Sequence, residues 1–159
     1  MGFLSSRNDP AIDPALEASI VFDESLGRNE VLRLVAQNQS SIQATIEVGE
    51  NVLGVVAYSK LGTSYVLVIT DRRVLNLKKG KLHGSLDRRD VGRTRIFNLP
   101  RNNGRYLVAI QTHDGMLYAD DDPARLEPGR WMSVASDDPK IPQRVSAIID
   151  EFYGLSYLG

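Results

Sequence analysis

The sequence contains no cysteine and only two histidines among its 159 residues. Disulfides and cysteine-ligated metal sites are therefore excluded, and the absence of cysteine fits a reducing compartment. No apolar run approaches the roughly 18 residues needed to span a bilayer. Residues 1–6 have neither the basic region nor the long apolar stretch of a secretory signal. We therefore expect a cytoplasmic protein, with peripheral attachment to a membrane as the alternative.

Side chains that commonly carry catalysis are scarce and isolated. The two histidines are His83 and His113, and no Gly-x-Ser-x-Gly elbow of a serine hydrolase is present. His113 stands beside Asp114 in a predicted turn, where a solvated histidine is the expected state. The carboxylates of 120–122 lack the spacing of a calcium-binding loop, and no glycine-rich phosphate loop is present. We expect no enzymatic activity, no cofactor and no metal site.

The net charge of −1 conceals an uneven distribution of charge. Residues 72–105 hold eleven basic and two acidic side chains, a net charge of +9. Residues 1–71 and residues 106–159 each hold four basic and nine acidic side chains, a net charge of −5. This asymmetry could create a strong local field, or the acidic flanks could fold over the basic segment and cancel it.

Basic side chains in predicted turns are the main candidates for contact with a partner or an anion. Nucleic-acid phosphates and an anionic membrane surface would both attract them, whereas pairing with the protein's own carboxylates is the structural alternative. A tryptophan is added because tryptophan and arginine are frequent at interface hot spots. The candidates are Lys60, Lys78, Lys79, Lys81, Arg88, Arg89, Arg101 and Trp131.

Two helices are expected before residue 48. Asp13 and Pro14 have the order of an N-cap and a first helical residue, which predicts a short helix over 14–20. Apolar residues at three- and four-residue spacing predict an amphipathic helix from about residue 28 to 41. We expect its apolar stripe to pack on the core, and binding of a partner or of a second copy of the chain is the alternative.

From residue 52 the sequence changes to short runs rich in β-branched and aromatic residues, separated by turn residues. The Asp114-Gly115 pair suits a tight hairpin, and the acidic run at 120–123 is expected to end the sheet. Seven strands are predicted, at residues 52–58, 65–70, 74–77, 82–87, 92–99, 105–112 and 116–119.

The C-terminal part of the chain predicts one further helix. Residues 124–138 have no clear assignment. Asp138-Pro139 is expected to open an amphipathic helix that runs to about Tyr153, and Gly154 is expected to end it. The predicted order is therefore helix, seven short strands and helix.

This layout resembles the pleckstrin-homology (PH) superfold, and the local sequence agrees. Glu50–Leu53 precedes a valine-rich strand, and Thr70-Asp71-Arg72-Arg73 joins two apolar strands, as in bacterial PH-like and GRAM-like domains. The resemblance covers about residues 48–153. It implies an α+β, mostly β fold: a seven-stranded antiparallel PH-like barrel or sandwich with a C-terminal capping helix and an added N-terminal helix.

Three parts of the chain are predicted, together with a structural role for the Thr70–Arg73 motif. The parts are a flexible tether (1–14), a helical extension (15–47) and the PH-like domain (48–159). At the motif, Asp71 can shape a turn through local hydrogen bonds. The two arginines can fix this turn through carboxylates or carbonyls.

The resemblance also implies a function in binding. Some members of the superfold bind phosphoinositides and many bind proteins. Lys60 could be the first lysine of the phosphoinositide signature, but the next strand, 64–70, has no basic residue. We therefore predict a non-enzymatic adaptor or regulatory module that engages a protein partner. The alternative is a peripheral binder of anionic lipid or nucleic acid through residues 72–105.

Overall fold

The structure is a computed structural model, and it describes residues 11–99, 105–112 and 131–154. Its elements follow one another as α2 (Pro14–Ala18), α3 (Arg28–Thr45), β1 (Val52–Lys60), β2 (Thr63–Thr70), β3 (Arg73–Lys78), β4 (Lys81–Asp87), the 3-10 turn η1 (Arg88–Asp90), β5 (Val91–Leu99), β6 (Arg105–Thr112), β7 (Trp131–Ser136) and α5 (Lys140–Phe152). No helix of these described ranges is long and apolar enough to cross a membrane.

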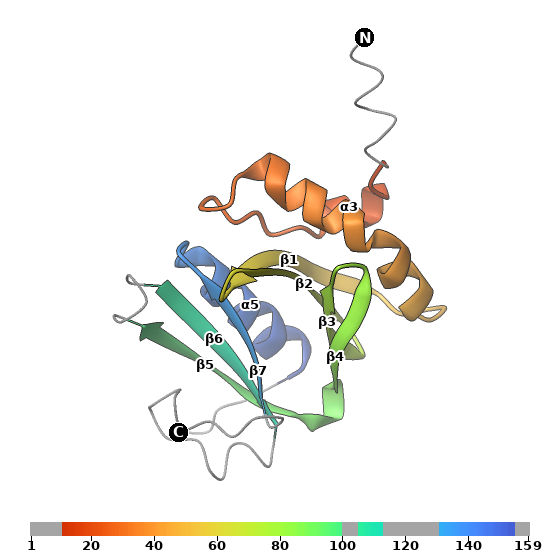
Figure 1. Ribbon diagram of the computed structural model, residues 1–159. Helices are drawn as coiled ribbons and strands as arrows, with labels where there is room; N and C mark the ends of the chain where they lie inside the picture. The colour runs from red at the N-terminus through yellow and green to blue at the C-terminus, as the bar shows by residue number, and fades with distance from the viewer. Residues whose placement is uncertain (1–10, 100–104, 113–130, 155–159) are drawn as a thin grey trace.

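The strands form two antiparallel sheets, so the predicted α+β, mostly β class is confirmed. One sheet has the order β1-β2-β3-β4 and the other the order β5-β6-β7. They remain two separate hydrogen-bonded ladders. In Figure 1, α3 lies above the four-stranded sheet, and α5 lies behind the strands where the two sheets diverge.

The positions of six predicted strands are confirmed, but the end of the second sheet differs from the prediction. The strand expected at 116–119 lies outside the described residues. The expectation that 120–123 end the sheet is wrong, because β7 pairs with β6 from Tyr106↔Ser136 to Gln111↔Trp131. Val134 is the only β-branched residue of β7, so local propensity gave no clear signal there.

Strands β1, β2 and β3 of the four-stranded sheet are buried on both faces, which explains their nearly continuous apolar runs. Toward the other sheet and α5, alternate residues join one core that includes Val56, Tyr58, Leu67, Ile69, Val74, Val108, Ile110, Val134, Ile141, Val145 and Ile149. On the opposite face, Val55, Ala57, Val66, Val68, Leu75 and Leu77 pack against Leu16, Val31, Leu34, Val35 and Ile42. The apolar stripe of α3 is thus core, as expected, and it is not free to bind a second copy.

The helix α3 also holds the β3–β4 hairpin, and it continues four residues beyond its predicted end. The amide of Gly80 donates a 2.8 Å hydrogen bond to Oδ1 of Asn38, and the Ser41 hydroxyl donates to the Gly80 carbonyl. Lys79 and Gly80 both have positive φ, as a tight turn requires. Polar residues near the end of α3 therefore serve as a docking site for this turn.

A buried ion pair joins α3, β1 and the β2–β3 turn. The Arg73 guanidinium donates to both carboxylate oxygens of Glu50, at 2.8 and 3.0 Å, and to the Thr45 carbonyl at 2.7 Å. The Thr70 hydroxyl donates to the same carboxylate at 2.5 Å. Hydrogen bonds from Arg73 are the main reason that the pKa of Glu50 falls to about 2. The predicted role of this arginine in fixing the turn is confirmed.

Shortening one side chain in the apolar stripe of α3 should destabilise the whole domain. Leu34 is 3% exposed, so Leu34→Ala should lower the free energy of unfolding by about 2–5 kcal/mol in urea denaturation. The control is Leu61→Ala at a site that is 90% exposed, where we expect a change within about 0.5 kcal/mol. Equal stability of the two variants would show that α3 is a dispensable addition.

The Glu50–Arg73 pair should make stability depend on acid pH. Because the pKa of Glu50 is lowered from 4.5 to about 2 on folding, its contribution is complete above pH 4.5 and is lost as the pH falls toward 2. Glu50→Gln should cost roughly 3 kcal/mol at pH 7 and flatten the pH dependence in this window. Glu47→Gln, beside the same arginine but 67% exposed, should have little effect. Parallel pH profiles for all three proteins would contradict this role.

Candidate functional site

The structure disperses the predicted basic candidates instead of gathering them. Lys78, Lys79 and Lys81 lie at the β3–β4 turn, whereas Arg88 and Arg89 lie in η1 at the other end of this hairpin. Lys60 ends β1. Arg101 lies outside the described residues, and for Trp131 only the backbone of β7 is described.

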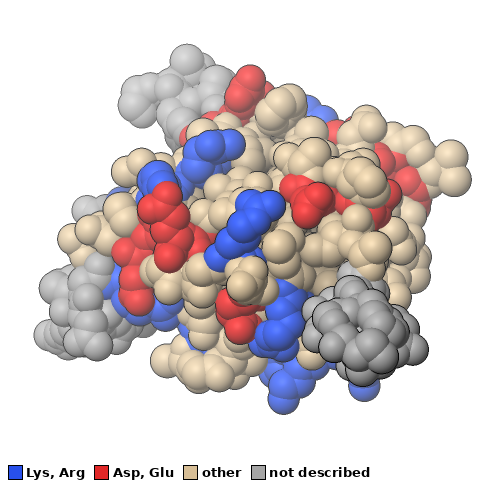
Figure 2. All heavy atoms as spheres, turned by 90° about the horizontal axis from the view of Figure 1, so that it is seen from above, with Lys and Arg blue, Asp and Glu red and all other residues tan. Residues whose placement is uncertain are grey.

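Several arginines of the basic segment bind the protein itself. Arg105 donates to the Asp137 carboxylate at 2.9 Å and to the Ser59 carbonyl at 2.7 Å, and Arg93 donates to Gln111 at 2.6 Å. Seen from the side of α3, basic and acidic side chains are interspersed (Figure 2). Some basic side chains of residues 72–105 are therefore occupied by contacts within the protein. The face on the side of α3 is not continuously basic.

The η1 arginines line an open hollow of about 340 Å³. Two carboxylates, those of Asp71 and Asp87, share this hollow with Arg72, Arg88 and Arg89. The carboxylates offset part of the positive charge at this end of the hairpin. An anion would therefore meet a mixed surface.

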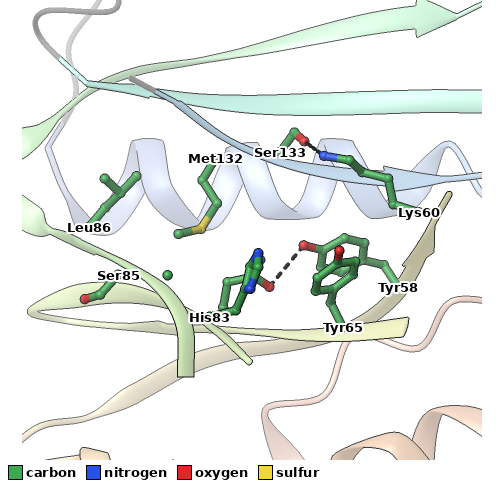
Figure 3. Close-up of a pocket in the computed structure, with 10 residues that line it drawn as sticks. Tyr58, Lys60, Tyr65, His83, Ser85, Leu86, Met132 and Ser133 are labelled. Atoms are coloured by element: carbon green, nitrogen blue, oxygen red, sulfur yellow. Dashed lines mark hydrogen bonds between the residues drawn. The ribbon is translucent and has the colours of Figure 1, made fainter. Parts of the chain in front are cut away.

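A larger cleft of about 530 Å³ opens between the sheets beside β4 (Figure 3). Its volume is within the range of ligand-binding clefts. We call it the inter-sheet cleft. It is lined by Tyr58, Lys60, Tyr65, Asn76, His83, Gly84, Ser85, Leu86, Met132 and Ser133.

A β-bulge places His83 in the inter-sheet cleft. Asn76 pairs with Gly84 and the next residue, Leu77, pairs with Leu82, so His83 is an extra residue in β4. In a regular strand, neighbouring residues point to opposite faces, whereas a bulge re-aims a side chain. The His83 ring lies 5.6 Å from the Tyr65 ring, and both point into the same space (Figure 3).

A fixed row of aromatic rings forms one wall of the inter-sheet cleft. Tyr58 and Tyr65 are stacked with ring centroids 5.2 Å apart, and Lys78 Nζ lies 6.0 Å from the Tyr65 ring. The Tyr58 hydroxyl donates a 3.0 Å hydrogen bond to Asn76, and burial raises the pKa of this phenol above its usual range. At its buried end this wall is therefore neutral, because the Tyr58 phenol keeps its proton. At the Tyr65 end, Lys78 adds a positive charge.

Lys60 joins the two sheets across the inter-sheet cleft. Its Nζ donates a 2.6 Å hydrogen bond to the Ser133 hydroxyl, and partial burial lowers the pKa of the ammonium group. Of the ten residues that line the cleft, Lys60 and His83 can carry positive charge and none is a carboxylate. The cleft lining therefore favours an anionic group over a cationic one.

Lys60 and Lys78 were candidates from the sequence, but the other main features of the cleft were not. Tyr58 and Tyr65 read as ordinary strand residues, and His83 reads as an isolated histidine. The one available signal was Gly84, because glycine inside a strand pattern often marks a bulge.

No cluster of three or more metal-ligating side chains occurs among the residues that the structure describes. No known family model matches the chain, and no curated protein is significantly similar to it. The geometry of the inter-sheet cleft is therefore the main indication of function.

The inter-sheet cleft should accept added volume that the core rejects. A Cβ at Gly84 would lie 3.5 Å from Met132, an ordinary contact, whereas a Cβ at Gly54 would lie 2.9 Å from Ile148. We expect the free energy of unfolding of Gly84→Leu to lie within about 1 kcal/mol of that of the parent protein. For Gly54→Leu we expect it to be lower by about 3 kcal/mol or more. Thermal and urea unfolding measure both, and a large loss for Gly84→Leu would show that the cleft is packed core.

Proposed function

We propose that the protein is a non-enzymatic binding module of PH-like layout that engages a protein partner at the inter-sheet cleft. The order of four strands, three strands and α5 supports this layout. A module of this kind would act as an adaptor or regulator, holding its partner without changing it chemically.

The observation that carries the proposal is the position of the inter-sheet cleft beside an open sheet edge. Among the described residues, β4 is paired on one side only, with β3. The other edge of this sheet is covered, because Ile20 bridges to Val55 and the amide of Val21 donates to the Val55 carbonyl at 2.8 Å. Exposed backbone next to a pocket suits a polypeptide ligand better than a small molecule.

The Lys60–Ser133 pair does not make a good nucleophilic site. A serine hydrogen-bonded to a lysine with a lowered pKa has the composition of a serine–lysine catalytic pair. However, Ser133 is only 5% exposed although it lines the inter-sheet cleft, so little of its surface is accessible to a substrate. Its contact with Lys60 serves better as a tie between the sheets.

The alternative function is peripheral binding to anionic lipid or nucleic acid through the basic segment. The exposed Lys79 and Lys81 at the hairpin tip favour it, since phosphates attract such side chains. The dispersal of the remaining basic side chains, and the carboxylates beside the η1 arginines, weigh against one continuous anion-binding face.

Affinity capture from a cleared lysate of the native host tests the proposal. We expect the tagged protein to retain one protein partner at moderate salt after treatment with nuclease and detergent. Gly84→Leu, which fills the inter-sheet cleft, should lose this partner, whereas Ala44→Leu on the exposed face of α3 should keep it.

Two results would contradict the proposal. Retained material that disappears with nuclease, detergent or modest salt would replace it with the anionic-surface alternative, because such contacts are strongly screened. Equal capture by the parent protein and Gly84→Leu would remove the inter-sheet cleft from the interface.

A further inference from the structure

The chemistry of the partner at the inter-sheet cleft can be inferred from the edge strand β4, provided that the proposed protein-binding function holds. This strand supplies four consecutive lining residues, His83–Leu86. Its side chains are mostly exposed, and even the apolar Leu82 is 47% exposed. An edge strand with this exposure is a template for another extended chain.

The bulge at His83 limits which part of β4 can pair with another chain. It interrupts the regular pairing of β4 with β3 at the position between Leu82 and Gly84. Bulges of this kind protect sheet edges from indiscriminate association. Regular backbone continues over Gly84–Asp87, opposite Asn76 to Arg73 of β3. A short added strand of about four residues therefore has a regular edge to pair with, next to the inter-sheet cleft.

Positive charge gathers at the end of the inter-sheet cleft near the bulge. Lys78 and Lys81 are directly opposite each other in the β3–β4 ladder, and like charges in this position reduce sheet stability. The Nζ of Lys78 lies over the Tyr65 ring, which also contacts His83. A carboxylate placed there would offset this repulsion and form charge-assisted hydrogen bonds.

We propose that a segment of the partner adds to β4 as an extended strand and places an acidic side chain between Lys78, Lys81 and His83. Backbone hydrogen bonds along Gly84–Asp87 hold the segment, and they depend little on its sequence. The acidic side chain provides the specificity. The neighbouring aromatic wall, Tyr65 above all, packs against the aliphatic part of this side chain.

Selection from a phage-displayed library of random 12-residue peptides on the full-length protein tests this inference. We expect the enriched peptides to share an Asp or Glu among residues of high β propensity. In hydrogen-exchange measurements, the bound peptide should slow exchange at alternate amides of Gly84–Asp87. Replacement of the shared acid by its amide should weaken binding at least tenfold.

Two matched double variants identify the cations that are used. The Lys78→Gln/Lys81→Gln protein should bind the selected peptides at least tenfold more weakly than the parent. Lys79→Gln/Arg33→Gln makes the same change of charge at exposed side chains outside the proposed contact, and it should change affinity less than twofold. All four side chains are at least partly exposed, and loss of Lys78 and Lys81 removes their repulsion, so neither variant should unfold at a lower temperature than the parent.

The outcomes separate this inference from the proposed function. Peptides or a captured partner that protect another surface, or that bind without an acid, would overturn the β4 inference and leave protein binding intact. Failure to select any peptide, while the lysate partner is still lost in Gly84→Leu, would overturn only the extended-strand mode. Binding of phosphatidylserine vesicles or a single-stranded oligonucleotide, with no protein or peptide bound, would overturn both.

Discussion

The rest of the structure depends on the buried pair between Glu50 and Arg73. The Glu50 side chain has no exposed surface, so leaving its carboxylate without the arginine would be strongly destabilising. The pair can form only when the end of α3, the start of β1 and the β2–β3 turn are together. The Tyr153 hydroxyl adds the C-terminal helix by donating a 2.8 Å hydrogen bond to the Thr70 carbonyl. Hydrogen bonds and one ion pair thus join this end of the four-stranded sheet to α3 and to the C-terminal helix.

The opposite end of the same strands contains features that are unfavourable for stability. There the sheet contains a partly buried lysine, Lys60, and a like-charged pair at Lys78 and Lys81. Each of these features reduces stability or regularity where a stable fold alone would need none of them. Local violations that a protein retains are expected where it functions. The contrast between the two ends is the physical reason for placing the binding site at the inter-sheet cleft.

The burial of both faces of β1, β2 and β3 narrows the choice of binding surface further. The apolar stripe of α3 covers one face, and the second sheet with α5 covers the other. With its faces occupied and the β1 edge bridged by Ile20, this sheet offers β4 to a partner. In the proposed mode of binding, α3 would contribute indirectly, by completing the core and by holding the hairpin that carries the lysines.

The sequence alone determined six strands, the three helices and the role of Arg73, because periodicity, turn residues and a local charge motif are properties of neighbouring residues. The tertiary structure decided the rest. Nothing local marks β7, whose place depends on pairing with β6. The cleft position of His83 depends on the register between β3 and β4, and a sequence pattern does not contain that register. The count of basic residues in 72–105 could not show that several of them face internal partners, because distances between charges exist only in the folded chain.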